Sequence, residues 1–394
     1  MENMVDYAEH MLLPVEELPY NAVDSLILSQ FSHFRFSGKN PDLFTWRGVP
    51  MEDLFREEIS DDLFFDIWDP KNSRRLFEAM AKNPRYAHAV VKGFVENTDA
   101  KVDKQFAAVC VQFNDDLCAV IFRGTDSSLV GWKEDLNMAF QSPIPSQTDA
   151  LSYLARVAEH CPGSLCVGGH SKGGNLAVYA SVFSDECVKA RIARIYSHDG
   201  PGFLKNVLDS EQFRTVADRI DKTVPQSSIV GMLLESQEKF RVVRSNRFGI
   251  MQHDPFSWEV RNTDFVSIAS LSATAGYLDK TLNRWLESIP DPDRRRLVNL
   301  IFRLVDSEEV ATTTELWARW KKNTSALIKK ITRVDEETKK FLNKTVKGLF
   351  SLGIKNFPEL WREPVKQAKK KTTGKRLPPS TATEKPKEMT GPTH

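Results

Sequence analysis

The sequence predicts an α/β fold in which a mainly parallel sheet is flanked by helices. Two observations lead to this prediction. Between residues 101 and 244, short apolar runs typical of strands alternate with segments whose apolar residues have helical spacing. One strand-to-helix junction also carries the pattern G-x-S-x-G at residues 169–173. That pattern needs a buried strand before it and a helix after it.

The composition is that of a folded chain: 394 residues, 41% of them hydrophobic, with a net charge of +1. This length allows one large α/β domain with an appendage, or two domains. The near-zero charge gives no sign of nucleic-acid binding by the body of the protein. Because no run of about 18 apolar residues and no secretory signal is present, we expect a cytoplasmic protein without a membrane-spanning helix.

The cysteines give no metal-binding pattern. They are odd in number and lack the spacing of metal ligands, and three of them lie in apolar runs where they look like small core residues. This usage fits a reducing compartment, and we expect neither a metal nor an organic cofactor. The five are Cys110, Cys118, Cys161, Cys166 and Cys187.

Residues 1 to about 100 look mostly helical, with apolar residues at helical spacing in 24–31 and 74–80. Phe and Trp are frequent in this part of the chain. We interpret them as core aromatics beneath a helical layer. A lipid-facing cover over an active site is the alternative.

The central part of the chain supplies the strands. Residues 104–113 and 117–122 predict a hairpin, because residues 114–116 (Asn-Asp-Asp) have turn chemistry. Further strands are expected at 164–168, 191–197 and 240–244, with helices at 148–160 and 174–183. This alternation is what predicts a parallel sheet covered on both faces.

The pattern becomes helical again from about residue 278, with stretches at 313–332 and 334–350. From residue 366 the chain is rich in Lys, Thr and Pro and should be disordered. A solvated charged tail is favoured over peripheral contact with anionic lipid or nucleic acid. The predicted divisions are an α/β domain at 1–278, a helical extension at 279–362 and a disordered basic tail at 363–394.

Ser171 is the candidate nucleophile, at the centre of Gly169-His170-Ser171-Lys172-Gly173. A serine hydroxyl needs a base to take its proton, and a sharp strained turn exposes its oxygen. Such a turn leaves no room for side chains on its flanks, hence Gly169 and Gly173. A glycine-rich turn that cradles phosphate is the alternative, but no dinucleotide-binding or P-loop pattern is present.

The base follows by elimination. In hydrolases with this elbow, the chain order is nucleophile, acid, histidine. Only His198, His253 and His394 follow Ser171. His394 ends the tail, and His198 is one residue from the best acid candidate, so their side chains should diverge. His253 remains, in a Pro-containing loop after a strand.

The acid is less sharply defined. Asp199 ends the strand after the elbow helix, where Gly200-Pro201-Gly202 turns the chain, and the carboxyl ends of parallel strands share one sheet edge. Asp221 is the alternative acid. Asp254 is adjacent to His253 and poorly placed to orient its ring.

An oxyanion hole needs donors aimed at the developing charge. One should be the backbone N–H of Lys172, directly after the nucleophile. The other should come from Gly124 and Thr125, at the end of an earlier strand. A purely structural turn is the alternative for residues 123–126.

Residues 122–125 (FRGT), taken with residues 169–173 (GHSKG), resemble the class 3 lipases. The likeness to the bacterial Mbeg1-like family is closer and spans roughly residues 5–350. It also rests on residues 18–28, 199–203, 224–231 and 253–258. The resemblance implies a lipase-like α/β-hydrolase in which the 122–125 loop supplies oxyanion donors. Class 3 lipases carry the acid two residues before a Val-Pro pair. Here Lys222 has that position, which puts Asp221 in doubt and favours Asp199.

These observations predict a serine ester hydrolase, of the lipase, lysophospholipase or esterase type, that uses Ser171, His253 and Asp199. The expected partner is a small-molecule or lipid ester, with no specific nucleic acid. Acyl transfer or thioester cleavage on the same fold, and a non-catalytic interaction protein, remain alternatives. Acyl-chain preference and oligomeric state do not follow from the sequence.

Overall fold

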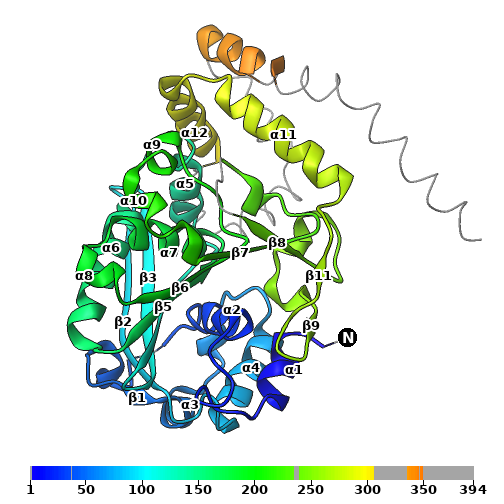
Figure 1. Ribbon diagram of the computed structural model, residues 1–394. Helices are drawn as coiled ribbons and strands as arrows, with labels where there is room; N and C mark the ends of the chain where they lie inside the picture. The colour runs from blue at the N-terminus through cyan, green and yellow to red at the C-terminus, as the bar shows by residue number, and fades with distance from the viewer. Residues whose placement is uncertain (1, 37, 235–238, 306–334, 346, 349–394) are drawn as a thin grey trace, which may run out of the picture.

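The computed structural model describes residues 2–36, 38–234, 239–305, 335–345 and 347–348 (Figure 1). Its centre is a nine-stranded sheet whose spatial order nearly follows the chain. The strands of this sheet, in spatial order, are β1 (Val49–Pro50), β2 (Val90–Asp99), β3 (Lys104–Asn114), β4 (Leu117–Phe122), β5 (Ser164–His170), β6 (Ile192–His198), β7 (Ile220–Pro225), β8 (Phe240–Val243) and β11 (Ser267–Ile268). A separate two-stranded ladder pairs β9 (Val260–Arg261) with β10 (Asp264–Phe265).

The sheet is mixed, so the prediction of a mainly parallel sheet is wrong. Neighbouring strands from β4 to β8 pair in parallel. Those from β1 to β4 are antiparallel, as is the β8–β11 pair. The reason is the length of the connections. Residues 100–103 join β2 to β3, and residues 115–116 join β3 to β4. Both connections are too short for the crossover that parallel strands need. The predicted hairpin of β3 and β4 is confirmed.

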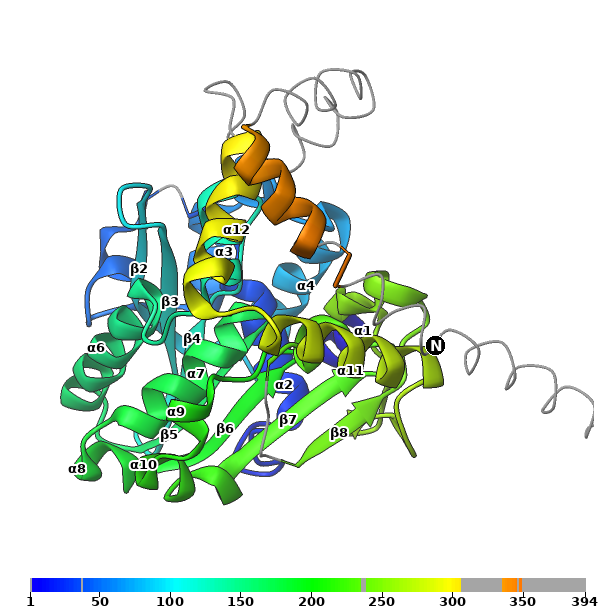
Figure 2. The same cartoon turned by 90° about the horizontal axis from the view of Figure 1, so that it is seen from above.

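Helices cover both faces of the sheet (Figures 1 and 2). One face packs against the N-terminal helices α1 (Met4–His10), α2 (Ala22–Phe31), α3 (Met51–Glu58) and α4 (Pro70–Lys82). The other packs against α6 (Pro145–His160), α7 (Lys172–Phe183), α8 (Glu186–Lys189), α9 (Lys205–Leu208) and α10 (Glu211–Arg214). The N-terminal aromatics Phe31, Phe34 and Phe64 are buried as predicted, whereas Phe65 and Trp68 are exposed.

Two longer helices follow the sheet: α11 (Ala273–Glu287) and α12 (Asp291–Val305). The side chain of Arg294 ties α12 to the body, since its Nη1 donates to Ala139 O at 2.6 Å. Residues 336–345 and 347–348 are helical too, in agreement with the predicted stretch at 334–350. The predicted helix at 313–332 and the tail at 363–394 lie outside the described residues. The boundary between 1–278 and 279–362 falls inside α11 and stays a prediction.

No helix among the described residues is long and apolar enough to span a bilayer.

Candidate active site

The junction between β5 and α7 forms a sharp, strained turn at Ser171. β5 ends at His170 and α7 begins at Lys172, which leaves Ser171 alone between them with φ 58° and ψ −130°. Positive φ is uncommon for a residue with a Cβ and is retained where the surrounding structure enforces it. The strand–turn–helix geometry predicted for residues 169–173 is therefore present.

Close backbone approach explains the two flanking glycines. A Cβ at Gly169 would lie 2.3 Å from the carbonyl carbon of Gly173. A Cβ at Gly173 would lie 2.1 Å from Phe122 O. Since both clashes are with backbone, no side-chain rotation could relieve them. The glycines thus let α7 start directly against the ends of β4 and β5.

A histidine–aspartate pair lies at the end of the next strand. β6 ends at His198, and Asp199 follows with a fully buried side chain and φ 48°. His253 Nδ1 and Asp199 Oδ2 are 2.7 Å apart. The other oxygen of Asp199 accepts from Gly231 N at 3.1 Å and from Ser228 Oγ. Three donors on one carboxylate fix its orientation and thereby that of the His253 ring.

The competing candidates lie in other surroundings. Asp221 is near the start of β7, with both oxygens on the Arg241 guanidinium at 3.2 and 3.3 Å. His198 is a core residue: Thr223 Oγ1 lies 2.8 Å from its Nδ1, and burial lowers its pKa to about 3. Asp254 pairs with Arg247 at 3.0 Å.

Backbone contacts bring the loops after β4, β5 and β6 together around Ser171. Ser171 N donates to His198 O at 2.9 Å. A Cβ at Gly200 would lie 3.0 Å from Ser171 O, and one at Gly124 would lie 3.3 Å from the Cβ of Ser171. Ligand sites of open α/β sheets form at this edge, outside the carboxyl ends of the strands.

His170 packs its ring on His253, with 4.5 Å between the ring centroids. Burial lowers the pKa of His170 well below its usual value, so this ring stays neutral. A neutral His170 imidazole therefore places no positive charge against the His253 ring.

Thr125 lies on the loop after β4, and its hydroxyl is already engaged. Thr125 Oγ1 donates to Asp135 Oδ2 at 2.5 Å. Asp135 belongs to α5 (Leu129–Asn137). Burial raises the pKa of Asp135 to about 6, an effect that the nearby Lys172 ammonium partly offsets. Because the hydroxyl proton of Thr125 is donated to Asp135, only the backbone N–H of Thr125 remains free to act in the predicted oxyanion role.

Lys172 contributes more than a backbone N–H. Its side chain is fully buried, and Nζ donates to Gln105 O and Gln105 Oε1 at 2.7 Å each and to Glu134 Oε2 at 3.0 Å. Asp135 Oδ1 lies 4.0 Å from the same nitrogen. This ion pair joins the first residue of α7 to α5. The Lys172 N–H itself opens a helix, where backbone donors have no intrahelical acceptor.

The model of the Mbeg1-like family matches residues 80–303, more than half of the chain. The chain belongs to the Mbeg1-like family. The Mbeg1-like region includes Ser171, His253, Asp199 and the predicted oxyanion residues. No curated protein matched the chain.

Solved structures with partial likeness to this Mbeg1-like protein are lipases. The native Rhizomucor miehei lipase–propeptide complex is 14% identical with a TM-score of 0.35, over 56% of this chain and 66% of that one. A triacylglycerol lipase whose catalytic centre is a serine protease triad is 14% identical with a TM-score of 0.35, over 57% and 78%. M37 lipase is 13% identical with a TM-score of 0.33, over 53% and 69%.

Sequence reasoning missed several members of the site of this Mbeg1-like protein. Ser228 and Gly231 were noted within residues 224–231 but not linked to Asp199. Glu134 and Asp135 lie on a helix that the sequence did not predict. A buried lysine directly after the nucleophile was the available signal for an acidic partner, since buried charges are paired.

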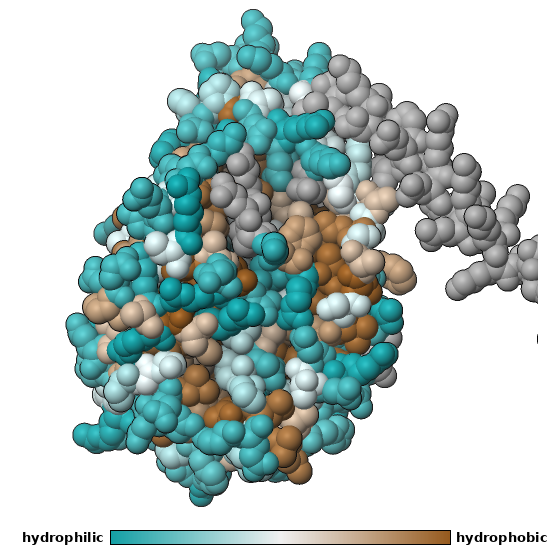
Figure 3. All heavy atoms as spheres, in the orientation of Figure 1, coloured by the Kyte–Doolittle hydropathy of each residue, from teal (hydrophilic) through white to brown (hydrophobic). Residues whose placement is uncertain are grey.

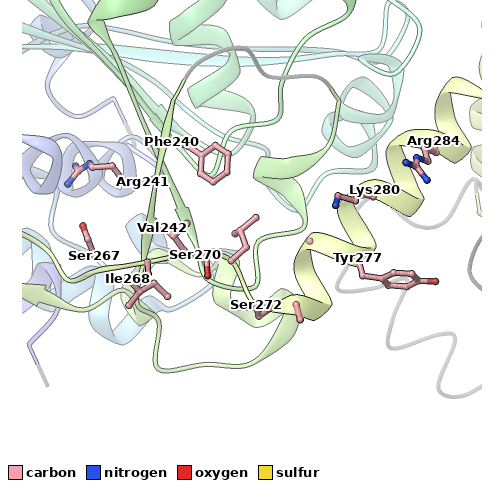
Figure 4. Close-up of a pocket in the computed structure, with 14 residues that line it drawn as sticks. Phe240, Arg241, Val242, Ser267, Ile268, Ser270, Ser272, Tyr277, Lys280 and Arg284 are labelled. Atoms are coloured by element: carbon pink, nitrogen blue, oxygen red, sulfur yellow. The ribbon is translucent and has the colours of Figure 1, made fainter. Parts of the chain in front are cut away.

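A cavity of about 970 Å³ lies elsewhere, between β8, β11 and α11 (Figure 4). Phe240, Tyr277, Lys280 and Arg284 are among its lining residues. Hydrophobic side chains gather near this part of the surface in Figure 3. None of the candidate catalytic residues lines it, so the candidate active site is defined by side-chain chemistry rather than by this cavity.

Proposed function

We propose that this Mbeg1-like protein is a serine hydrolase of carboxylic esters. The observation that carries the proposal is the strained elbow at Ser171, whose neighbour His170 packs on His253, together with the 2.7 Å pair of His253 and Asp199. A nucleophile on a strained turn, a histidine and a buried carboxylate that orients the histidine are the three parts of acyl-enzyme chemistry.

In the proposed reaction, Ser171 Oγ attacks the ester carbonyl and His253 Nε2 takes the serine proton. Asp199 holds the His253 ring through Nδ1 and stabilises the imidazolium that forms. The backbone N–H groups of Lys172 and Thr125 receive the oxyanion, together with the positive end of α7. His253 then protonates the leaving alcohol, and water releases the acyl group by the same steps.

The substrate we propose is a lipid-like ester, because apolar side chains are exposed on the segments that carry the site. Phe248 is 89% exposed and precedes His253 by five residues. Trp68 and Trp132 of α5 are exposed as well. Exposed apolar side chains that form one contiguous patch mark ligand, membrane or protein interaction sites. These three residues form what we call the apolar rim.

The test is hydrolysis of p-nitrophenyl esters by the wild type and by Ser171→Ala. Removal of the nucleophile should lower kcat by on the order of 10⁴–10⁶-fold and abolish labelling by a fluorophosphonate probe. Ser152→Ala, an exposed serine of α6, is the matched control and should retain full activity and labelling. Unchanged turnover in Ser171→Ala would refute the proposed nucleophile.

Chain length tests the substrate class separately. A series of esters from acetate to a long acyl chain should give rising kcat/KM for the wild type if the apolar rim holds the chain. A flat or falling series would refute the lipid-like substrate while leaving the nucleophile intact. Labelling of Ser171 without hydrolysis, together with an acylated alcohol among the products, would favour acyl transfer.

A further inference from the structure

Three cysteines that are far apart in sequence meet in the core of the sheet. Cys110 of β3, Cys118 of β4 and Cys161 at the end of α6 are all fully buried. Their sulfur atoms lie within 4.8 Å of one another, and Cys110 Sγ is 3.6 Å from Cys161 Sγ. We call these three residues the thiol cluster.

Strand register explains how the cluster forms without a sequence motif. Gln112 of β3 is the cross-strand partner of Cys118 in β4. Since side chains two residues apart on a strand share a face, Cys110 lies on the same face as Gln112 and Cys118. That face packs against α6, whose last turn delivers Cys161. The contact is thus a consequence of the hairpin, which linear spacing does not reveal.

A buried ammonium lies beside the thiols. Lys92 of β2 is the cross-strand partner of Cys110 and is 5% exposed. Its Nζ donates to Gln112 Oε1, whose residue is the cross-strand partner of Cys118. No carboxylate lies within ion-pair distance of Lys92 in the part of the chain that the structure describes. A buried cation needs an anion, and cysteine thiolates are the groups here that can supply one.

We propose that Cys110, Cys118 and Cys161 bind one thiophilic divalent metal ion as thiolates, with Zn²⁺ as the fitting ion. Zinc bonded to sulfur at about 2.3 Å in tetrahedral geometry separates its sulfurs by about 3.8 Å. The 3.6 Å pair already has this spacing, and the third sulfur needs a shift of about 1 Å at most.

Charge and chemistry select the class of ion. A divalent ion and the Lys92 ammonium together neutralise three thiolates, whereas a monovalent ion would leave a net negative charge in the core. All-sulfur donors favour soft ions over Mg²⁺ or Ca²⁺. Binding releases to solvent the protons that the thiols of the cluster still carry, and it needs no oxidant or reductant.

One member of the cluster has exposed neighbours in the chain, and the cluster is separate from the candidate active site. Cys161 is flanked in sequence by the exposed residues His160 and Pro162. β5 begins three residues after Cys161 and ends at His170, so the length of this strand, about 20 Å, separates the cluster from Ser171. We therefore expect the ion to stabilise β3, β4 and α6 rather than to take part in ester hydrolysis.

The experiment is a Zn²⁺ titration of the full-length chain, first stripped of metal by a chelator and kept reduced, against a chromogenic competitor. Wild type should bind one equivalent and gain on the order of 5 °C in Tm at saturation. Each of Cys110→Ser, Cys118→Ser and Cys161→Ser should bind at least tenfold more weakly. Cys166→Ser, buried on the other face, and Cys187→Ser, exposed, are matched controls that should bind as the wild type does.

A wild-type measurement keeps the proposal testable if a variant fails to fold. Co²⁺ bound at the cluster should give the sulfur-to-cobalt charge-transfer absorption of a thiolate site. The absence of one tight equivalent, the absence of that absorption, or undiminished binding in all three cluster variants would each overturn the proposal.

Discussion

Asp199 and Asp221 were both candidates for the acid, and their surroundings distinguish them. Asp199 accepts three hydrogen bonds, one of them from His253, while Asp221 is held by Arg241. We expect Asp199→Asn to lower kcat by about 10⁴-fold, because an amide in this position favours the wrong tautomer of the histidine. The measurement is kcat on a short ester at pH 7.

Asp221→Asn is the matched control for that prediction and should keep kcat within about twofold of the wild type, since it affects only a partly exposed ion pair. A large loss of kcat in Asp221→Asn, with near-normal activity in Asp199→Asn, would reverse the assignment of the acid.

Gly124 is the second residue whose substitution should be decisive. A Cβ there would lie 2.6 Å from His170 O, a backbone atom that cannot rotate away. We expect Gly124→Ala to displace the oxyanion loop and to lower kcat by about 10²–10³-fold, the cost of losing one oxyanion donor. KM for a short ester should change little. Steady-state kinetics separates the two parameters.

Gly276→Ala is the control for Gly124→Ala. Gly276 lies in α11, where an added Cβ meets nothing within 4 Å, so activity should be unchanged. If Gly124→Ala retained full kcat, the loop after β4 would have no part in binding the oxyanion.

At the scale of elements, the Lys172–Glu134 pair joins α5 to α7. Glu134 also accepts from Gln105 N at 3.0 Å and from Ser146 N at 2.9 Å. Replacing one partner of a buried ion pair leaves an uncompensated charge. We therefore expect Lys172→Met to lower the free energy of unfolding by about 3–5 kcal/mol, measured by urea denaturation at pH 7.

The double variant Lys172→Met/Glu134→Gln should lose less stability than the sum of the two single variants, because neither charge is then left unpaired. Lys82→Met removes an exposed pair with Glu78 and is the control with little effect. Additive losses in the double-mutant cycle would mean that the two side chains do not stabilise each other.

The elements that the sequence predicted are those with a clean apolar period. The hairpin of β3 and β4, together with β5 and α7, repeats its apolar residues without interruption. β2 was missed because a bulge between Lys92 and Val95 breaks its alternation. β7 was missed because Asp221 and Lys222 interrupt its apolar pattern, although Lys222 is buried in the structure. In both cases, packing overrides local pattern.

For the whole molecule, the site could be anticipated only where chain order constrained it. His253 was chosen as the candidate base because it follows Ser171 in the chain. In the structure, His253 lies against Asp199. The contribution of Asp135 could not be anticipated, because it arises from a helix without a catalytic motif that packs against β3. A contact between residues that fold together in this way has no pattern in the sequence from which it could be predicted.

Asp135 also makes the stability of the whole molecule depend on pH. Burial raises its pKa in the folded state from 3.8 to about 6. Between these values the folded protein retains a proton that the unfolded chain releases. Stability therefore falls as pH rises from about 4 to about 6 and stays reduced above that. Asp135→Asn removes this cost and should raise the free energy of unfolding at pH 7 by on the order of 1–3 kcal/mol.

The gain in Asp135→Asn should disappear below about pH 4, where the carboxyl is protonated in both states. Urea denaturation of both proteins at pH 4 and pH 7 measures the difference. Asp149→Asn, which removes a partly exposed partner of Lys104, is the matched control and should give no gain at pH 7. A loss of stability in Asp135→Asn at pH 7 would contradict this prediction. It would mean that Lys172 and Thr125 stabilise the ionised carboxylate by more than burial destabilises it.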